Sequence, residues 1–488
     1  MGAADRLDEF FEVSEEGSSI RTELIAGVTT FLAMAYIIVV NPSILLGAIV
    51  GFDEDGGLNP ETTIDGATYT AGEVFQMLAI ATILASVLAT LVMALYARRP
   101  FGLAPGMGLN AFFAFTVVLA MGIPWQVALA AVFVEGIIFI AITALGVRRY
   151  VIELFPEPVK FSVGAGIGVF LLFLGLQEME VVVPYPEGTL VELGNIAQSP
   201  VALLGLAGLA LTLMLWARGI TGSLIIGILT TTLAGWALIL ANVVDEAVLG
   251  PEALVDEETG QLSFETVLSP QYDITPLAGA FVEGLSQADA FTFALVVFTF
   301  FFVDFFDTAG TLIGVSQFGG FLDEEGDLPE IEKPLMADAV GTTFGAMVGT
   351  STVTTYIESS TGIEEGGRTG LTALVVAALF ALALVAVPLV AAIPTYASYI
   401  ALVVVGIIML QGVLDIDWSD PAWAVSAGLT ITVMPLTASI ANGLAAGIIA
   451  YPLIKLAMGE VREVHLGQWV TALALVGYFY VTTSGMVG

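Results

Sequence analysis

Acidic side chains interrupt several long apolar stretches of this sequence. They are Glu135, Asp304, Asp307, Asp338 and Glu358. A carboxylate at membrane depth is energetically expensive, so such residues are candidates for function. Removal from water also favours the neutral form of a carboxylic acid, which lets the group take up and release a proton. Two such groups around one cavity can accept hydrogen bonds from a planar, N–H-rich solute while one of them couples to a cation.

The strongest candidates lie in two motifs. In FFFVDFFDTAGTLIG (300–314), Asp304 and Asp307 are three residues apart, so both fall roughly on one face of a helix and can flank a cavity. In GTSTVTTYIESSTG (349–362), a run of β-branched Thr and Val favours extended backbone just before Glu358. A new half-helix should begin there, where the carboxylate can meet a ligand and free backbone N–H groups.

Three of the acids have alternative interpretations, and for Asp304 the alternative is a supporting position behind the residues that contact the ligand. Glu135, in FVEGIIF, either belongs to a site or hydrogen-bonds to a neighbouring helix, and both interpretations stay open. Asp338, in MADAVGTTFG, lies near the start of its predicted helix, which favours a capping role.

The composition places these residues in a polytopic membrane protein. Of 488 residues, 57% are hydrophobic and only 12% are charged, and the mean hydropathy is +0.94. Apolar runs of about 20 residues, the length of a membrane-spanning helix, recur from residue 24 onwards. Cysteine is absent and the one histidine is His465, so disulfides, zinc sites and thiol or histidine catalysis are not expected. With no nucleophile–base pair, metal cluster or phosphate loop, the sequence predicts neither an enzyme nor a resident metal or cofactor.

The positive charges predict an orientation. With the N-terminus in the cytoplasm, all 12 Lys and Arg residues fall at the inner side, whereas the loops 47–73 and 244–287, which have none, fall outside. This topology has fourteen spans, and the apolar stretch 466–484 is either an interfacial helix or an additional span. The predicted helices are 22–46, 74–97, 101–121, 124–147, 160–178, 199–217, 221–243, 288–316, 335–348, 352–366, 369–393, 396–413, 421–436 and 439–457.

The charge balance is strongly acidic. There are 47 acidic residues against 12 basic ones, a net charge of −35, and the acids gather in the loops 51–57, 255–260 and 321–332. This pattern favours a solvated surface in a halophilic protein, where salt screens the self-repulsion. Recruitment of cations is the alternative interpretation.

The two halves, 1–243 and 288–457, each contain seven predicted spans, and an odd number places them in opposite orientations as an inverted repeat. The third span of the first half is broken by Gly and Pro in RPFGLAPGMGLNAFFAF (99–115), and the third span of the second half contains the Thr-rich motif. Interrupted spans paired in this way indicate a transporter's substrate site. Close helix packing through small residues is the alternative.

These motifs identify a family. FFVDFFDTAGTLIG and GTSTVTTYIESSTGIEEGGRTGLTA, with RTELIAGVTTFLAMAYIIVVNPSIL (21–45) and APGMGLNAFFAF (104–115), resemble the nucleobase–cation symporters that include the xanthine/uracil permeases. The resemblance is strongest to the adenine/guanine/hypoxanthine branch. It implies an all-α polytopic fold of 14 transmembrane segments in a 7+7 inverted repeat. Short antiparallel strands in segments 3 and 10 would hold the base between them.

The resemblance also implies domains and site residues. A core domain would comprise 1–147 and 288–393, and a gate domain 148–287 and 394–488. Asp307 and Glu358 would hold the base and carry the coupling proton, with Asn110 matching the asparagine of the purine branch. Thr308 and Thr311 stand where uracil-type members have histidines, which disfavours that branch. The remaining expected site neighbours are Gly108, Asp304, Thr311, Tyr356, Ile357 and Ser359.

The expected function is import of purine nucleobases (hypoxanthine, adenine, guanine) by symport with a cation, H⁺ before Na⁺, in an elevator-like step. The expected location is the cell membrane, multi-pass, with lipid as a partner, no nucleic acid, and a homodimer left open. Transport of xanthine, uracil or another small solute on the same fold is the alternative. An anion transporter is disfavoured by the two acids, and a channel or receptor by polar residues concentrated at one level of the membrane.

Overall fold

A computed structural model describes residues 3–52, 58–146, 155–184, 191–251, 254, 271–288, 290–323 and 328–483. It is mostly helical, and within these ranges ten helices are long and apolar enough to cross a membrane. The chain is therefore a multi-pass membrane protein. These ten are Ile20–Val50, Ala71–Ala97, Trp125–Leu145, Glu157–Glu178, Pro200–Ala217, Ser223–Leu240, Thr292–Gln317, Gly370–Val390, Thr395–Asp415 and Ile440–Met458.

Most predicted helices are present close to their expected bounds. The predicted helix 421–436 is α21 (Pro421–Leu436), and the undecided stretch 466–484 contains the helix α23 (Leu466–Thr483). The predicted single helices 101–121 and 352–366 instead each contain a three-residue strand followed by a helix. Much of the acidic loops 51–57, 255–260 and 321–332, together with Arg148, Arg149 and the predicted domain boundary at 147/148, lies outside the described residues.

The chain divides into two compact units. The first comprises residues 1–141 and 174–404, and the second comprises 142–173 and 405–488. The elements that lie mainly in the first are α1 (Ala3–Phe11), α2 (Ile20–Met34), α3 (Ile37–Val50), β1 (Glu61–Ile64), β2 (Ala67–Thr70), α4 (Ala71–Val92), the π-helical η1 (Met93–Ala97), β3 (Leu103–Pro105), α5 (Met107–Ala111), the π-helical η2 (Phe112–Ala120), α6 (Trp125–Leu145), β4 (Val182–Pro184), β5 (Val191–Leu193), α9 (Pro200–Ala217), α10 (Ser223–Leu240), α11 (Glu246–Leu249), α13 (Ala280–Gln287), α14 (Ala290–Gly319), α15 (Glu332–Val348), β6 (Val353–Thr355), α16 (Ser359–Glu364), α17 (Gly370–Ala383), the 3₁₀ turn η4 (Leu384–Ala386), α18 (Val387–Val390) and α19 (Thr395–Ser398). Helix α20 (Ile400–Met409) is divided equally between the two units.

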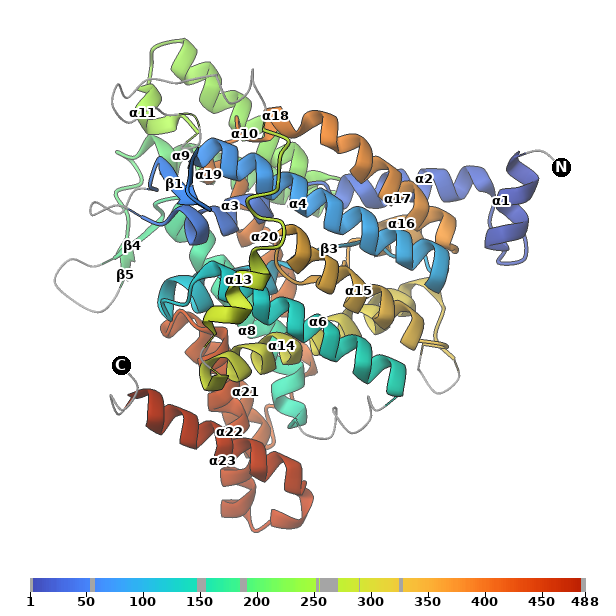
Figure 1. Ribbon diagram of the computed structural model, residues 1–488, viewed down its shortest axis with the longest axis vertical. Coiled ribbons are helices and arrows are strands. Elements are labelled where there is room, and N and C mark those ends of the chain that lie inside the picture. Colours follow the sequence, from blue (N-terminus) through green and yellow to red (C-terminus); the bar gives the residue numbers. More distant parts are fainter. Residues whose placement is uncertain are drawn as a thin grey trace. The chain divides into compact units, whose positions relative to one another are not determined.

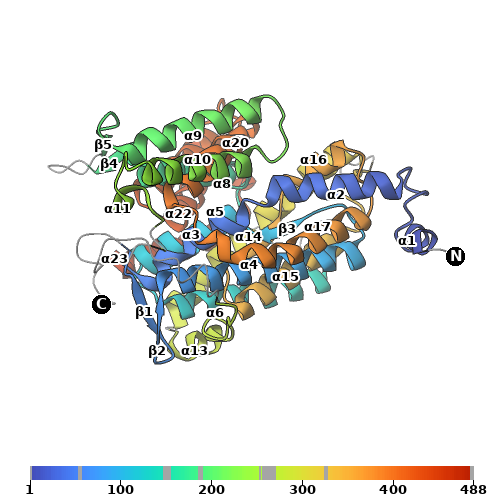
Figure 2. The same cartoon turned by 90° about the horizontal axis from the view of Figure 1, so that it is seen from above.

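In the first unit, α4 packs against α3, α15 and α17, and α2 packs against α16 and α17 (Figure 1). The strand β3 lies within this group of helices (Figure 2). It pairs antiparallel with β6, with Leu103 opposite Thr355 and Pro105 opposite Val353. Both strands are buried, so the pairing satisfies backbone groups that lipid could not.

A buried carboxylate ties α2 to the start of α17. One oxygen of Glu23 accepts a hydrogen bond from the backbone N–H of Arg368 at 3.0 Å. The other accepts from the N–H groups of Thr369 and Thr372 at 3.3 and 3.2 Å and from both threonine hydroxyls. Because a helix N-terminus carries unpaired N–H groups and partial positive charge, this carboxylate adds to the N-cap that Thr369 provides for α17.

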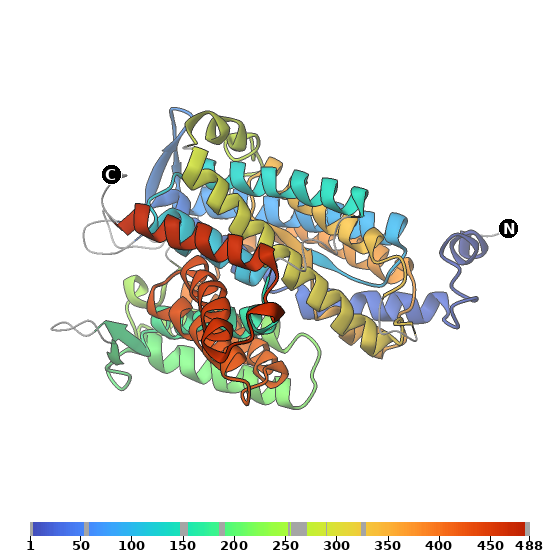
Figure 3. The same ribbon diagram turned by 90° about the horizontal axis from the view of Figure 1, so that it is seen from below.

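The second unit contains most of α8 (Glu157–Glu178), the 3₁₀ turns η5 (Leu410–Asp415) and η6 (Val461–Glu463), and the helices α21, α22 (Ile440–Met458) and α23. Helices α21 and α22 pack closely against each other, as the orange and red ribbons of Figure 3 show. Gly447 permits this approach, because a Cβ there would collide with the hydroxyl of Thr430.

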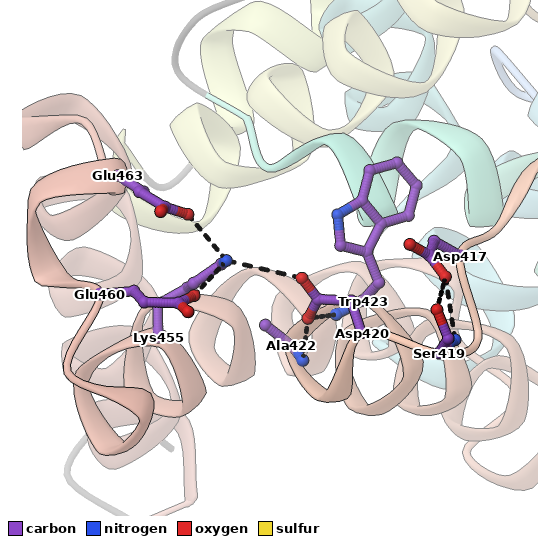
Figure 4. Close-up of polar contacts among 8 residues, drawn as sticks. All are labelled: Asp417, Ser419, Asp420, Ala422, Trp423, Lys455, Glu460 and Glu463. Atoms are coloured by element: carbon purple, nitrogen blue, oxygen red, sulfur yellow. Dashed lines mark hydrogen bonds and ion pairs between the residues drawn. The ribbon is translucent and has the colours of Figure 1, made fainter.

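An ion-paired lysine closes the end of this helix pair (Figure 4). The Nζ of Lys455, a side chain only 6% exposed, lies 2.7 Å from Glu460, 2.9 Å from Glu463 and 3.6 Å from Asp420. Asp420 is also the N-cap of α21, accepting from the backbone N–H of Ala422 at 2.7 Å. One cation therefore links both helices and the turn η6.

Candidate substrate site

The paired strands each lead into a short helix, β3 into α5 and β6 into α16. Hydrogen bonds extend the pairing at both ends, from Gly106 N–H to the carbonyl of Thr352 at 2.9 Å and from Tyr356 N–H to the carbonyl of Gly102 at 3.0 Å. The hydroxyl of Ser359 accepts from Gly102 N–H at 3.0 Å. The two broken segments are thus held together by backbone groups, which fixes the residues that follow them.

Glu358 occupies the position before the first residue of α16, and its side chain does not cap that helix. Its Oε1 instead accepts a hydrogen bond from the hydroxyl of Tyr36 at 2.7 Å. The residue is half-buried, and Ile357 beside it is 46% exposed. A carboxylate held in this way still has free lone pairs on its oxygens, which can accept hydrogen bonds from a solute.

Helix α14 packs against α16, β6 and α5 and supplies the second acid. Asp307 and Thr311 are four residues apart, share a helix face and are both half-buried. No side chain or backbone group of the described residues donates a hydrogen bond to the Asp307 carboxylate. Among the predicted site residues, four have exposed surface: Asp307, Thr311, Ile357 and Glu358.

The other predicted site residues, Gly108, Asn110, Asp304, Tyr356 and Ser359, are buried. Asn110 is fully buried, and its Nδ2 donates to Oδ1 of Asn41 at 3.1 Å. Asn41 in turn donates to the hydroxyls of Thr82 and Thr350, at 2.7 and 2.8 Å. The Oδ1 of Asn110 has no partner among the described residues, which leaves a buried acceptor beside the strands.

Asp304 and Asp338 lie on a second layer behind the strands. The hydroxyl of Thr308 is 3.3 Å from Oδ1 of Asp304, 2.9 Å from Oδ2 of Asp338 and 2.7 Å from the hydroxyl of Thr354. Asp338 lies inside α15 and is completely buried, so the capping role predicted for it is wrong. The sequence pattern could not show this, because α15 begins three residues earlier than predicted, at Glu332.

Tyr36 and Asn41 are contacts that the sequence reasoning missed. The first predicted span, 22–46, consists of the helices α2 and α3 with a break at Ala35 and Tyr36. The available signal was Asn41–Pro42 inside an apolar run, since a polar amide and a proline are each unfavourable in an uninterrupted spanning helix. No group of three or more His, Asp or Glu side chains in the described ranges is arranged to hold a metal ion.

Comparison with known proteins gives a consistent result. Residues 21–446 match the Permease family of xanthine/uracil permeases. The adenine permease AdeP of Escherichia coli is 37% identical over 470 residues, 96% of this chain and 95% of that protein. The guanine/hypoxanthine permease PbuO of Bacillus subtilis is 40% identical over 468 residues, 93% of this chain and 96% of that protein.

A solved structure shares the fold. The transmembrane domain of a cyanobacterial bicarbonate transporter, BicA, matches with a TM-score of 0.54 and 16% identity over 88% of this chain and 97% of that one. The family match and the relatives each cover most of the sequence, and the relatives are permeases and not enzymes. The chain therefore belongs to the permease family that contains the xanthine/uracil permeases.

Proposed function

We propose that this permease imports purine nucleobases and that the base binds beside the paired strands β3 and β6. Relatives named as adenine and guanine/hypoxanthine permeases support the substrate class. The observation that carries the site is that Asp307 and Glu358 are half-buried acids, one on α14 and the other at the N-cap position of α16, and these two helices pack against each other. A purine has ring and exocyclic N–H groups along its edges, and two carboxylates are strong acceptors for them.

The proposed roles follow the exposure of each residue. Glu358, oriented by Tyr36, and Asp307 accept hydrogen bonds from the base, and Thr311 and the backbone around Ile357 border it. Gly108, Asn110, Tyr356 and Ser359 act from the buried side by shaping the two broken segments. Two acids disfavour an anionic substrate, so the fold shared with a bicarbonate transporter does not extend to its substrate.

The finer features of transport are part of the same proposal. The chain would have fourteen spans, a core domain (1–147, 288–393) and a gate domain (148–287, 394–488), and an elevator-like movement coupled to a cation. It would lie in the cell membrane with the N-terminus in the cytoplasm. The acidic surface would suit a halophilic source, and a homodimer stays a prediction.

The test is uptake into cells that lack their own purine permeases. We expect radiolabelled hypoxanthine, adenine or guanine to enter, and a competition panel with xanthine and uracil to rank the substrates. Failure of all three purines in cells with good surface expression would overturn the purine assignment. Competition by uracil but by no purine would favour the uracil alternative.

A further inference from the structure

A second group of acids lies behind the strands, and the proposed base site does not use all of it. Glu135 of α6, Asp304 of α14 and Asp338 of α15 form this buried acid cluster, and each is 0% exposed. The carboxyl groups of Glu135 and Asp304 interact with each other, and the Asp338 carboxyl group lies near both. The three helices therefore bring three carboxyl groups together beneath the solvent-accessible surface.

Hydrogen-bond donors for this cluster are too few. The Thr308 hydroxyl has one proton for both Asp304 and Asp338, because the Thr354 hydroxyl can donate to Thr308 in their contact. Asp338 also faces the Thr355 backbone N–H and the Thr355 hydroxyl, the latter at 3.5 Å from its other oxygen. Both carboxyl oxygens of Glu135 and Oδ2 of Asp304 are buried and receive no hydrogen bond from the described residues. Two facing carboxylates cannot donate to each other, so their contact needs a proton.

The surrounding charges point the same way. Among the described residues, the ionisable groups that interact with the cluster are its own members and Asp307, and none of these is basic. The cluster is also not arranged to hold a metal ion. Several ionised carboxylates that are buried from bulk solvent and face no basic group of the described residues carry a large desolvation penalty, and protonation lowers it.

We propose that Glu135 and Asp304 share one exchangeable proton and that this pair is the proton-coupling site of the transporter. The proton adds to a carboxylate oxygen of the pair, forming a carboxylic acid whose O–H donates to the other carboxylate, and no other bond changes. This assignment rests on the proposed purine transport. It places the coupling proton away from Asp307 and Glu358, where the sequence predicts it.

The connection to the base site is a hydroxyl pair. Thr308 reaches from Asp304 to Thr354 of β6, and β6 runs directly into Tyr356, Ile357 and Glu358. Gain or loss of the shared proton changes which oxygens need the Thr308 hydroxyl as a donor. The strand that positions Glu358 would thereby respond to the protonation of the pair.

The test uses Glu135→Gln in proteoliposomes. The glutamine amide N–H takes the place of the shared proton, so we expect a melting temperature no lower than wild type. Exchange of labelled base at equal pH should stay within about threefold. A pH gradient should drive the wild type to about tenfold accumulation of base per pH unit, which is the limit for one coupled proton. For Glu135→Gln, the ratio of base inside to base outside should stay near one.

Thr343→Val is the matched control. The Thr343 side chain lies against Gly136, next to Glu135 in the sequence, but it has no titratable group, so this variant should accumulate base like the wild type.

Each other outcome is decisive. Accumulation by Glu135→Gln equal to wild type, or wild-type accumulation driven by Na⁺ and not by pH, would overturn the proton site and leave purine transport standing. Absence of purine exchange by wild type would contradict the proposed function itself. The proton site can still be tested in that case by infrared spectroscopy of the purified protein.

The difference spectrum, wild type minus Glu135→Gln, should contain the C=O band of a protonated carboxyl group. Absence of this band would refute the shared proton. If Glu135→Gln does not fold, Glu135→Asp should shift that band and not remove it.

Discussion

Removing the hydroxyl that orients Glu358 should weaken base binding without disturbing the fold. The substitution is Tyr36→Phe, which deletes one oxygen and keeps the aromatic ring that packs 6.5 Å from the ring of Tyr356. The lost hydrogen bond, at 2.7 Å from Glu358 Oε1, is the contact that holds this carboxylate from outside its own segment. The carboxylate of Tyr36→Phe should therefore sample more orientations before a base arrives.

The size of the effect follows from the geometry. A hydrogen bond to a charged group contributes about 1.5 to 3 kcal/mol when buried. Glu358 is half-buried, so water recovers part of this, and we expect a loss of about 1 to 2 kcal/mol in binding free energy. This corresponds to a rise of about 5- to 30-fold in Kd.

The assay is equilibrium binding of labelled base to the purified protein, with the melting temperature measured in parallel. Tyr272→Phe is the control, because its hydroxyl lies in an exposed part of the chain and donates to Leu384 at 3.3 Å. A Kd for Tyr36→Phe within twofold of wild type, at an unchanged melting temperature, would refute the orienting role of Tyr36. A large fall in melting temperature would show that the hydroxyl serves the fold instead.

Further predictions concern stability. Glu23→Ala leaves the buried N–H groups at the start of α17 without an acceptor and should lower the free energy of unfolding by about 3 kcal/mol or more. Glu73→Ala removes part of the exposed cap of α4 and should lower it by about 1 kcal/mol. Denaturation of the purified variants in detergent measures both losses. Lys455→Met leaves three acids facing one another and should cost about 1 to 3 kcal/mol, since those acids are partly exposed. Molar salt should recover part of the Lys455→Met loss by screening the repulsion, and a stability equal to wild type would show that the lysine is not a link.

The sequence predicts the helices of this fold well because each long apolar run carries its own signal. Helices α21 and α22 lie within a residue of their predicted bounds, 421–436 and 439–457. The broken segments were also visible, since Gly and Pro before Asn110 and the Thr run before Glu358 are unfavourable in an uninterrupted helix.

Contacts across the chain were not predictable in the same way. The pairing of Tyr36 with Glu358 joins residues 322 positions apart, and that of Asn41 with Asn110 joins residues 69 apart. Helical periodicity says which face a residue occupies, not which distant residue meets that face. The Asp338 interpretation failed for a related reason, because a shift of the helix start moved the residue from a cap to the interior.

The central claim is that Asp307 and Glu358 bind a purine base, and its most direct measurement is base affinity in matched variants. Equilibrium binding of labelled hypoxanthine, adenine and guanine is compared between wild type, Asp307→Asn, Glu358→Gln and the exposed control Glu61→Gln. Loss of a charge-assisted hydrogen bond that leaves its partner unpaired predicts a Kd raised by about 30-fold or more for each site variant, and an unchanged Kd for Glu61→Gln. Wild-type affinity in both Asp307→Asn and Glu358→Gln would contradict the site, whatever the substrate proves to be.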